Sequence, residues 1–203
     1  RFDDLAMREY SIASIPAQGI LELVVRQEKT ATGLGLGSGW LTEHAALGQR
    51  LHAKIRSNPS FHLKDAQQAL ILIGNGTGIS GLVAHLAQRQ QWGAQQNWLI
   101  FGEREQQFDH LYQQQIELWQ AQGFLPVVDY AFSRKKKKKI YVQHILQQKS
   151  VQLLSWVETG AAIYVCGSLQ GMAQEVEQSL LNILGAEQLQ QLKVQGRYQR
   201  DIY

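Results

Sequence analysis

The fold of this chain is decided by the stretch Leu70-Ile71-Leu72-Ile73-Gly74-Asn75-Gly76-Thr77-Gly78-Ile79. Its four apolar residues predict a buried strand, and the glycines after them predict a tight turn into a helix. Glycines let a backbone pass close to a ligand, and a helix N-terminus offers free N–H groups to phosphate. The spacing is not that of the G-x-G-x-x-G fingerprint, because Ile79 holds the third glycine's place, and it is not that of a P-loop. The residues alone therefore leave two interpretations open, a phosphate-binding loop and a plain strand–helix turn.

Beyond this stretch the sequence alternates strand and helix patterns. Apolar runs bounded by amphipathic segments are typical of a parallel sheet that helices cover on both faces. The strand candidates are Ala69–Ile73, Asn97–Phe101, Leu125–Ala131 and Ala162–Cys166, and the helix candidates are Gly81–Gln91, Phe108–Gln122, Val142–Thr159, Gly171–Leu184 and Ala186–Lys193. A polar tail is expected after the last of these helices.

The sequence changes character near residue 66. Before it, short strand-like runs separated by turns that contain Gly and Pro predict an antiparallel barrel or sandwich. These runs are Tyr10–Ser14, Ile20–Gln27, Arg50–Ile55 and Phe61–Leu63, with one helix candidate, Trp40–Leu47, after the glycine-rich run Gly33–Gly39. We therefore expect two units, residues 1–66 and residues 67–203.

The composition excludes several classes of protein. A hydrophobic fraction of 44% with 18% charged residues is that of a globular chain rather than a disordered one. No apolar run approaches the length needed to span a bilayer. The single cysteine, Cys166, excludes an intramolecular disulfide and a cysteine-rich metal site. The six histidines lack metal-ligand spacing, so we predict no metal site.

A basic run, Lys135–Lys139, follows Ser133 and Arg134 just after the strand candidate Leu125–Ala131. The C-terminal end of a parallel strand is where such sheets bind ligands. Guanidinium, ammonium and hydroxyl groups there suit a phosphate monoester, such as the 2′-phosphate that separates NADP from NAD. A lysine run by itself is more often a solvated basic loop. A nucleic-acid patch is a weaker alternative, because no aromatic or glycine-rich RNA-binding signature accompanies the run.

Two further positions have ordinary structural explanations when each is considered alone. Cys166 ends a buried strand candidate, where a lone cysteine is usually a small core residue. Tyr203 ends the polar segment Arg197–Tyr203, and an exposed tyrosine in a terminal segment is uninformative.

Taken together and in this order, seven segments resemble the ferredoxin–NADP reductase superfamily. The likeness is closest to its diflavin branch, which includes cytochrome P450 reductase and the flavoprotein subunit of sulfite reductase. The segments resemble an R-x-Y-S flavin motif, a flavin pyrophosphate loop, a G-x-G-T-G-I loop, an F-G-x-R…D-x-L-Y segment, an S-R…K-x-Y-V-Q segment, a Y-V-C-G strand and a terminal R-Y-Q-R-D-I-Y. In this sequence they are Arg8–Ser11, Gly35–Leu41, Gly74–Ile79, Phe101–Arg104 with Asp109–Tyr112, Ser133-Arg134 with Lys139–Gln143, Tyr164–Gly167 with Met172-Ala173, and Arg197–Tyr203.

The resemblance implies an α/β fold with a ferredoxin reductase-like, parallel-sheet NADP-binding domain in residues 67–203. It implies that residues 1–66 form part of an antiparallel FAD-binding β-barrel. Only seven residues precede Arg8, whereas the R-x-Y-S motif normally lies midway through that barrel. Several barrel strands are therefore expected upstream of this sequence.

On the flavin side, the resemblance implies that Arg8 pairs with the FAD pyrophosphate, Tyr10 packs beside the isoalloxazine and Ser11 bonds near flavin N5. Tyr203 would cover the flavin ring until the nicotinamide displaces it. The implied FAD-binding residues are Arg8, Tyr10, Ser11, Gly35, Leu36, Gly37, Ser38 and Tyr203.

On the nucleotide side, the resemblance implies three groups of residues. Gly76, Thr77, Gly78 and Arg104 would hold the NADPH pyrophosphate. The adenosine 2′-phosphate and its ribose would contact Ser133, Arg134, Lys139, Tyr141 and Gln143. The catalytic residues at the nicotinamide would be Ser11, Cys166, Asp201 and Tyr203.

The implied activity is hydride transfer from NADPH to FAD, with electrons passed on to FMN, flavodoxin, ferredoxin or a haem protein. FMN is a possible cofactor of an upstream domain. The expected partners are NADPH and a redox protein or domain, without nucleic acid. We expect a cytoplasmic protein, or one on the cytoplasmic face of a membrane and attached only through upstream segments. The alternative is a non-catalytic NADP-binding module or a remnant of a reductase.

The sequence departs from the family pattern at two places near the cofactor. The family's loop commonly reads G-P-G-T-G-I-A-P, and here Asn75, Ser80 and Gly81 replace its Pro, Ala and Pro. The family's C-G-D becomes Cys166-Gly167-Ser168, which removes a carboxylate.

Overall fold

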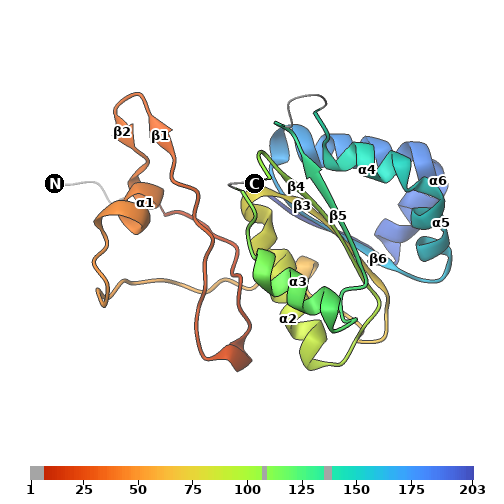
Figure 1. Ribbon diagram of the computed structural model, residues 1–203, viewed down its shortest axis with the longest axis horizontal. Helices are drawn as coiled ribbons and strands as arrows, with labels where there is room; N and C mark the ends of the chain where they lie inside the picture. The colour runs from red at the N-terminus through yellow and green to blue at the C-terminus, as the bar shows by residue number, and fades with distance from the viewer. Residues whose placement is uncertain (1–6, 107–108, 135–138) are drawn as a thin grey trace.

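A five-stranded parallel sheet forms the centre of the molecule (Figure 1). The structure is a computed structural model that describes residues 7–106, 109–134 and 139–203. In spatial order the strands are β5 (Val127–Phe132), β4 (Asn97–Glu103), β3 (Leu70–Asn75), β6 (Ala162–Gly167) and β7 (Tyr198–Ile202). The strand order reverses direction between β3 and β6, and open α/β sheets bind ligands at such a switch point. The α/β class with a parallel sheet, predicted from the sequence, is confirmed.

Helices cover both faces of the sheet, as Figure 1 shows. One face packs against α4 (Val142–Gln148), α5 (Ser150–Glu158) and α6 (Gln174–Val194), and the other against α2 (Ile79–Gln91) and α3 (Gln113–Ala121). Successive residues of β3 alternate between the two cores: Ile71 and Ile73 enter one, Leu70 and Leu72 the other. Because both faces are buried, β3 is a continuous apolar run, which made it recognisable from the sequence.

The predicted polar tail is wrong, because its residues form the fifth strand. Strand β7 pairs in parallel with β6 and places Asp201 beside Cys166. Its sequence, Tyr-Gln-Arg-Asp-Ile, has only two apolar residues, because it lies at the sheet edge and is largely half-buried. An edge strand of this kind lacks the apolar run by which the central strands were predicted.

Helix positions were predicted better than helix boundaries. The predicted helix Val142–Thr159 is two helices, α4 and α5, which meet at Lys149. The two helices predicted after Gly171 are confirmed as the two parts of α6, which is interrupted at Gly185 by a non-helical backbone with a φ of +79°. Helix α3 begins at Gln113, later than predicted, after Tyr112 in a left-handed conformation. Phe108, the predicted start, lies outside the described residues.

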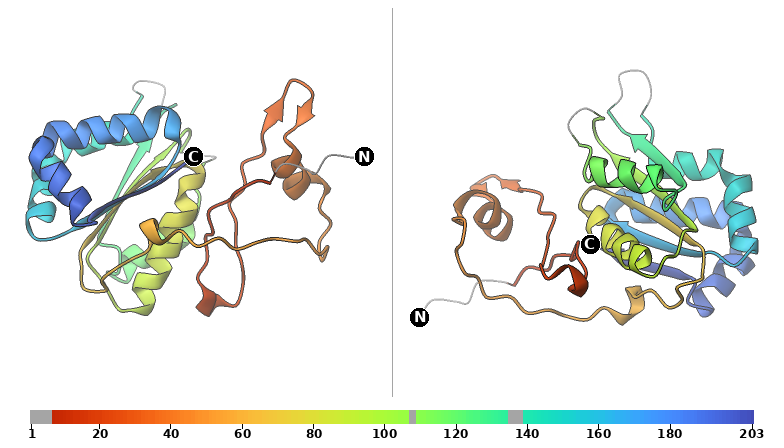
Figure 2. Two further views of the ribbon diagram at one scale, coloured as in Figure 1. Left: turned by 180° about the vertical axis from the view of Figure 1, so that it is seen from behind. Right: turned by 60° about the horizontal axis from the view of Figure 1, so that its bottom comes forward.

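Residues 7–66, which we call the arm, lie beside the α/β part of the chain, residues 67–203 (Figure 2). In the described arm, strand pairing consists of the hairpin β1 (Lys29–Thr30) and β2 (Gly33–Leu34) and one bridge, Ile12–Leu23. Its helical turns are η1 (Pro16–Gln18), α1 (Leu36–Gly39), η2 (Trp40–His44) and η3 (Pro59–Phe61).

The barrel expected for this region is therefore not formed by the described arm residues alone. The predicted strand Arg50–Ile55 is unpaired, Phe61 belongs to η3, and the helix predicted at Trp40–Leu47 begins earlier, at Leu36. A strand needs a neighbour for its N–H and C=O groups, and these segments have none in the described chain. Ile20 and Ile55 are 60% and 70% exposed, so the apolar pattern that suggested strands is left uncovered.

Candidate functional site

The glycine loop lies at the switch point of the sheet, pressed against the end of β6. A Cβ on Gly74 would lie 2.6 Å from the Cys166 carbonyl oxygen, and one on Gly78 would lie 2.5 Å from the Cys166 carbonyl carbon. Gly76 instead needs glycine for its φ of +54°. Close packing against β6 therefore requires glycine at Gly74 and Gly78. Gly76 is required instead by its left-handed backbone, which lies at the edge of the sheet where ligands bind.

Two of the departures from the family pattern contact each other. Asn75 Oδ1 accepts a hydrogen bond of 3.1 Å from the backbone N–H of Ser168. The Ser80 hydroxyl donates to the Thr77 carbonyl at 2.9 Å, which ties the first turn of α2 to the glycine loop. A Cβ on Gly81 would lie 3.2 Å from Cys166 Sγ, so this glycine lets α2 approach the cysteine closely. Each residue that departs from the family's loop therefore makes a local contact or allows a close approach in this structure.

Asp201 gathers side chains from three other segments of the chain. The Ser11 hydroxyl donates to Asp201 Oδ2 at 2.9 Å, and the Asn58 amide donates to Oδ1 at 3.2 Å. The Cys166 thiol lies 3.9 Å from Oδ2. Burial, and then the Asp201 charge, raise the pKa of Cys166 far above its ordinary value, so the thiol stays neutral. The structure therefore brings together Ser11, Cys166 and Asp201, and it adds Asn58, which the sequence did not indicate.

Tyr203 lies at the edge of this cluster. Its backbone N–H donates to the Gly167 carbonyl at 3.1 Å, and its carbonyl accepts from the Leu169 N–H at 2.9 Å. The side chain is 54% exposed, and its hydroxyl lies 3.1 Å from the Thr77 hydroxyl. Partial burial raises the pKa of Tyr203 to about 12, so the hydroxyl is protonated at neutral pH. The ring can therefore leave the loop by breaking only its side-chain contacts, to Thr77 and Ser11, while the backbone remains fixed.

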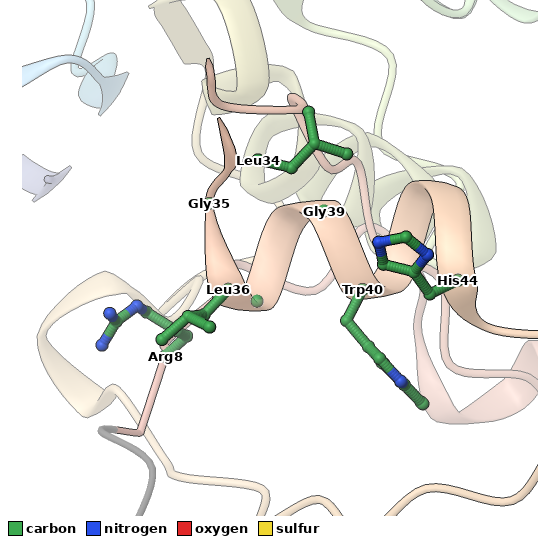
Figure 3. A pocket seen from close by; sticks show the side chains of 8 residues that line it. Arg8, Leu34, Gly35, Leu36, Gly39, Trp40 and His44 are labelled. Carbon is green, nitrogen blue, oxygen red and sulfur yellow. The ribbon is translucent and has the colours of Figure 1, made fainter. Parts of the chain in front are cut away.

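The two flavin motifs meet in the arm around a cavity of about 390 Å³ (Figure 3). A Cβ on Gly37 would lie 2.8 Å from the Tyr10 hydroxyl and 3.0 Å from Arg8 Cγ, so a side chain there would block this approach. The Ser38 hydroxyl accepts from the Glu28 N–H at 3.0 Å and keeps its own proton to donate. The cavity is lined by Arg8, Leu34, Gly35, Leu36, Gly37, Gly39, Trp40 and His44.

This arrangement fits a phosphate group. The Arg8 guanidinium and backbone without Cβ atoms line the cavity, and the Ser38 hydroxyl belongs to the same loop. Trp40 and His44 also line the cavity, although neither is among the FAD-binding residues that the resemblance implied.

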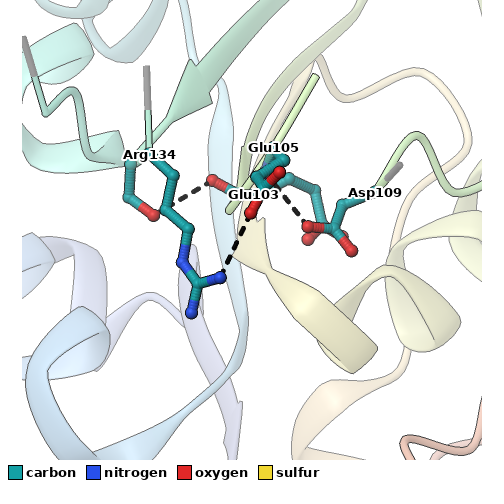
Figure 4. Close-up of polar contacts among 5 residues, drawn as sticks. Glu103, Glu105, Asp109 and Arg134 are labelled. Atoms are coloured by element: carbon teal, nitrogen blue, oxygen red, sulfur yellow. Dashed lines mark hydrogen bonds and ion pairs between the residues drawn. The ribbon is translucent and has the colours of Figure 1, made fainter. Parts of the chain in front are cut away.

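The residues predicted to bind the 2′-phosphate lie just after β5 and around the start of α4. Figure 4 shows one of them, Arg134, beside Glu103 and Glu105. Ser133 donates to the Glu103 carbonyl through its N–H at 2.9 Å and its hydroxyl at 3.3 Å. Arg134 forms an ion pair of 3.1 Å with Glu105, and its side chain is 59% exposed. Exposed ion pairs contribute little, so this guanidinium can exchange Glu105 for a phosphate. Of the other members, Lys139 and Tyr141 are exposed and Gln143 is half-buried. Arg104, which was predicted to hold the pyrophosphate, is exposed beside them. Lys135–Lys138 lie outside the described residues.

Glu103, at the end of β4, is a buried carboxyl group that the sequence did not indicate. It is only 6% exposed, and its Oε1 has no hydrogen-bond partner in the described part of the chain. Burial, and then the nearby Asp109 charge, raise the pKa of Glu103 to about 7, against the opposing effects of Arg26 and Arg104.

This shift has a consequence for stability. Between pH 4.5, the ordinary value, and about 7, the folded protein holds a proton that the unfolded chain releases, so stability falls as the pH rises through that window. Glu103→Gln cannot ionise. At about pH 8 its free energy of unfolding is expected to exceed that of the wild type by up to roughly 3 kcal/mol, so it unfolds at a higher urea concentration. The difference disappears towards about pH 4. Urea unfolding from acidic to mildly alkaline pH measures the difference, with the exposed Glu158→Gln as control. Parallel pH profiles for the wild type and Glu103→Gln would contradict the prediction.

The arm also contacts the α/β part away from Asp201. The Tyr112 hydroxyl donates to the Glu22 carboxylate, and Phe61 packs among buried residues of the face that carries α2. Arg26 lies against Gly76 of the glycine loop. Arg26 is a functional candidate that the sequence analysis missed, because a single arginine in a strand-like run has no distinguishing pattern.

No helix in the described ranges is both long enough and apolar enough to cross a membrane. Across those same ranges, no group of His, Cys, Asp and Glu is arranged to hold a metal ion.

Comparison with known proteins identifies relatives of this chain. The family model for the oxidoreductase NAD-binding domain matches residues 72–178, just over half of the sequence. Sulfite reductase [NADPH] flavoprotein alpha-components of Mannheimia succiniciproducens and Salmonella typhi are each 36% identical to it, over 98% of this chain and 36% of their own length. The corresponding protein of Bacillus subtilis is 34% identical over 83% of this chain and 30% of its own length. The chain thus spans about a third of the length of the curated relatives it matches.

Proposed function

We propose a function from the premise that the chain belongs to the oxidoreductase NAD-binding domain family, in the diflavin branch of the ferredoxin–NADP reductase superfamily. The proposed function is hydride transfer from NADPH to FAD, with electrons then passed to a redox partner. Because the relatives are flavoprotein alpha-components of sulfite reductase, the proposed partner is another component of an enzyme of that kind. Residues 67–203 would bind NADPH, and the arm would contribute part of the FAD site.

One observation supports this proposal above the others, the hydrogen bond of 2.9 Å between Ser11 and Asp201. Ser11 belongs to the motif expected at the flavin, and Asp201 to the segment expected at the nicotinamide. Transfer between two cofactors requires their reacting atoms in contact, so residues assigned to the two sites must meet. These two residues are 190 positions apart in the sequence, and they meet beside the glycine loop.

The side chains at this junction suit the chemistry. FAD, when bound, would accept the hydride at N5, and the protein supplies position and charge. The Asp201 carboxylate, fixed by donors from Ser11 and Asn58, would stabilise positive charge that develops on the nicotinamide side. Cys166, neutral and buried, would shape the pocket rather than act as a nucleophile. Tyr203 would move from Thr77 to admit the nicotinamide ring.

Replacing Arg134 with alanine tests the nucleotide assignment. In the full-length, flavin-loaded protein, the KM for NADPH is expected to rise about 10-fold or more, because a charge-assisted contact to the 2′-phosphate is lost. The KM for NADH should stay unchanged. Steady-state reduction of ferricyanide with each nucleotide measures both values.

The matched control for this test is Lys149→Ala, which removes a cation whose ammonium lies 3.6 Å from Asp129. An unchanged KM for NADPH in Arg134→Ala, or equal efficiency with NADH in the wild type, would contradict the 2′-phosphate assignment.

The alternative function is a non-catalytic NADP-binding module that has lost its flavin. The close approach of Arg8 and Tyr10 to Gly37 favours the reductase, because a chain that no longer bound flavin would not need glycine at this position. Flavin absorbance near ~450 nm in the purified full-length protein distinguishes the two functions. Its absence, together with retained NADP⁺ binding, would favour the module.

A further inference from the structure

The turn η3 (Pro59–Phe61) lies against the edge strand β7, which carries Asp201. Asn58, the residue that precedes the turn, donates its side-chain amide to Asp201 Oδ1 at 3.2 Å, and the Ser11 hydroxyl donates to Oδ2 at 2.9 Å. Each carboxylate oxygen is thus held by a donor from a different segment of the arm. The last torsion of an aspartate side chain has a broad range, so the second donor is needed to fix the plane of the carboxylate.

The amide of Asn58 is held in the orientation that donates to Asp201. Its Oδ1 accepts a hydrogen bond of 2.6 Å from the Ser60 hydroxyl. In the opposite orientation the amide oxygen would face a carboxylate oxygen, and both of these groups only accept hydrogen bonds. The turn therefore supplies the donor together with the residue that orients it.

The turn is fixed to the α/β part by its last residue and by the residue that follows. Phe61 is only 5% exposed, and the centroid of its ring lies 4.8 Å from that of His85 of α2 and 5.3 Å from that of Tyr164 of β6. The Tyr164 hydroxyl donates to the His62 carbonyl at 2.9 Å. Two elements of the α/β part thus set the position of the turn, and the amide before it is placed by this packing.

We propose that Asn58 is a positioning residue for hydride transfer, and that its amide holds the Asp201 carboxylate in the orientation that the transfer uses. This inference rests on the proposed function, which places the nicotinamide beside Asp201. It adds that the last turn of the arm acts on the transfer through Asp201 and without contacting a cofactor. Because the essential property is the hydrogen-bond donor, a residue of the same shape that only accepts should be worse at this position than alanine.

The variants Asn58→Ala and Asn58→Asp test the donor. Aspartate keeps the shape of asparagine but turns an acceptor towards Asp201, and the two carboxylates repel each other. In the full-length, flavin-loaded protein at about pH 7, the rate constant of flavin bleaching by NADPH is expected to fall about 5-fold in Asn58→Ala and about 30-fold in Asn58→Asp. The Kd for NADP⁺ should change less than about 2-fold in both variants. Stopped-flow absorbance measures the rate constant, and isothermal titration calorimetry of the oxidised protein measures the Kd.

The pH dependence of the same rate constant separates positioning from mere support of the fold. Two carboxylates at hydrogen-bond distance share a proton, so the loss of rate on acidification should begin about 1 pH unit higher in Asn58→Asp than in the wild type. The titratable groups recorded beside Asp201 and the turn are Cys166, Tyr203 and His85. Burial raises the pKa of Cys166 far above its ordinary value, raises that of Tyr203 to about 12 and lowers that of His85 to about 4. These three groups therefore stay neutral over the range from about pH 6 to about pH 9 in which the profiles are compared.

Two further variants complete the test. Asn182→Asp makes the same chemical change at an exposed position of α6 and should leave the rate constant and its pH profile unchanged. Ser60→Ala keeps the donor and removes the group that orients it, so its loss of rate should be smaller than that of Asn58→Ala. If Asn58→Asp bleaches at the wild-type rate, or if both Asn58 variants lose the same rate with the wild-type pH profile, the positioning role is wrong and the proposed function stands. If NADPH does not bleach the flavin of the wild type, the proposed function itself fails.

Discussion

Asp201→Asn is expected to lower the kcat for NADPH-dependent ferricyanide reduction about 100-fold in the full-length, flavin-loaded protein. The substitution keeps the size of the side chain and removes the charge on which Ser11 and Asn58 converge. Groups preorganised around developing charge act mainly in the transition state, so the KM for NADPH should change much less than kcat. Stopped-flow measurement of flavin bleaching after mixing with NADPH isolates the affected step.

The control for this experiment is Asp65→Asn, an exposed aspartate in the segment that precedes β3. It should retain a kcat within about 2-fold of the wild type. A kcat for Asp201→Asn within about 3-fold of the wild type would show that its charge does not assist the transfer.

Gly78→Ala is expected to destabilise the protein by about 3 kcal/mol or more. The new methyl group would lie 2.5 Å from the Cys166 carbonyl carbon and 2.7 Å from Gly167 Cα, both backbone atoms inside the sheet. These atoms cannot move without disturbing the pairing of β3 with β6, so no side-chain rotation relieves the clash. Urea unfolding followed by circular dichroism gives the free energy of unfolding.

Gly93→Ala provides the comparison. Gly93 has a φ of +72° with no atom within 4 Å of a Cβ, so the substitution costs only conformational strain of about 1 kcal/mol. Equal losses for the two variants would mean that the loop can relax away from β6.

The central strands could be predicted because burial on both faces leaves an unambiguous apolar signal. Strands β3, β4 and β6 lie in the middle of the sheet, and their residues are almost entirely buried. Strand β7 escaped prediction because an edge position permits polar residues. In the arm the reverse error occurred: apolar alternation predicted strands, but a strand forms only when a neighbour supplies its hydrogen bonds.

The candidate site could be predicted where residues belong to a contiguous motif. Ser11, Cys166 and Asp201 each lie in such a motif, and the fold brings them together. Asn58 and Arg26 are isolated polar residues in the arm, and only the tertiary placement of the arm directs them towards Asp201 and Gly76. No local pattern marks residues of this kind, since their role depends on contacts between distant segments.

The convergence on Asp201 also determines when this cluster of side chains can form during synthesis. Its two donors, Ser11 and Asn58, precede it by 190 and 143 positions, so the arm leaves the ribosome long before its acceptor exists. Contacts of such sequence separation form late in folding. Meanwhile the exposed apolar residues of the nascent arm are open to wrong partners, which favours aggregation. The cluster around Asp201 is therefore expected to be the last part of this sequence to assemble.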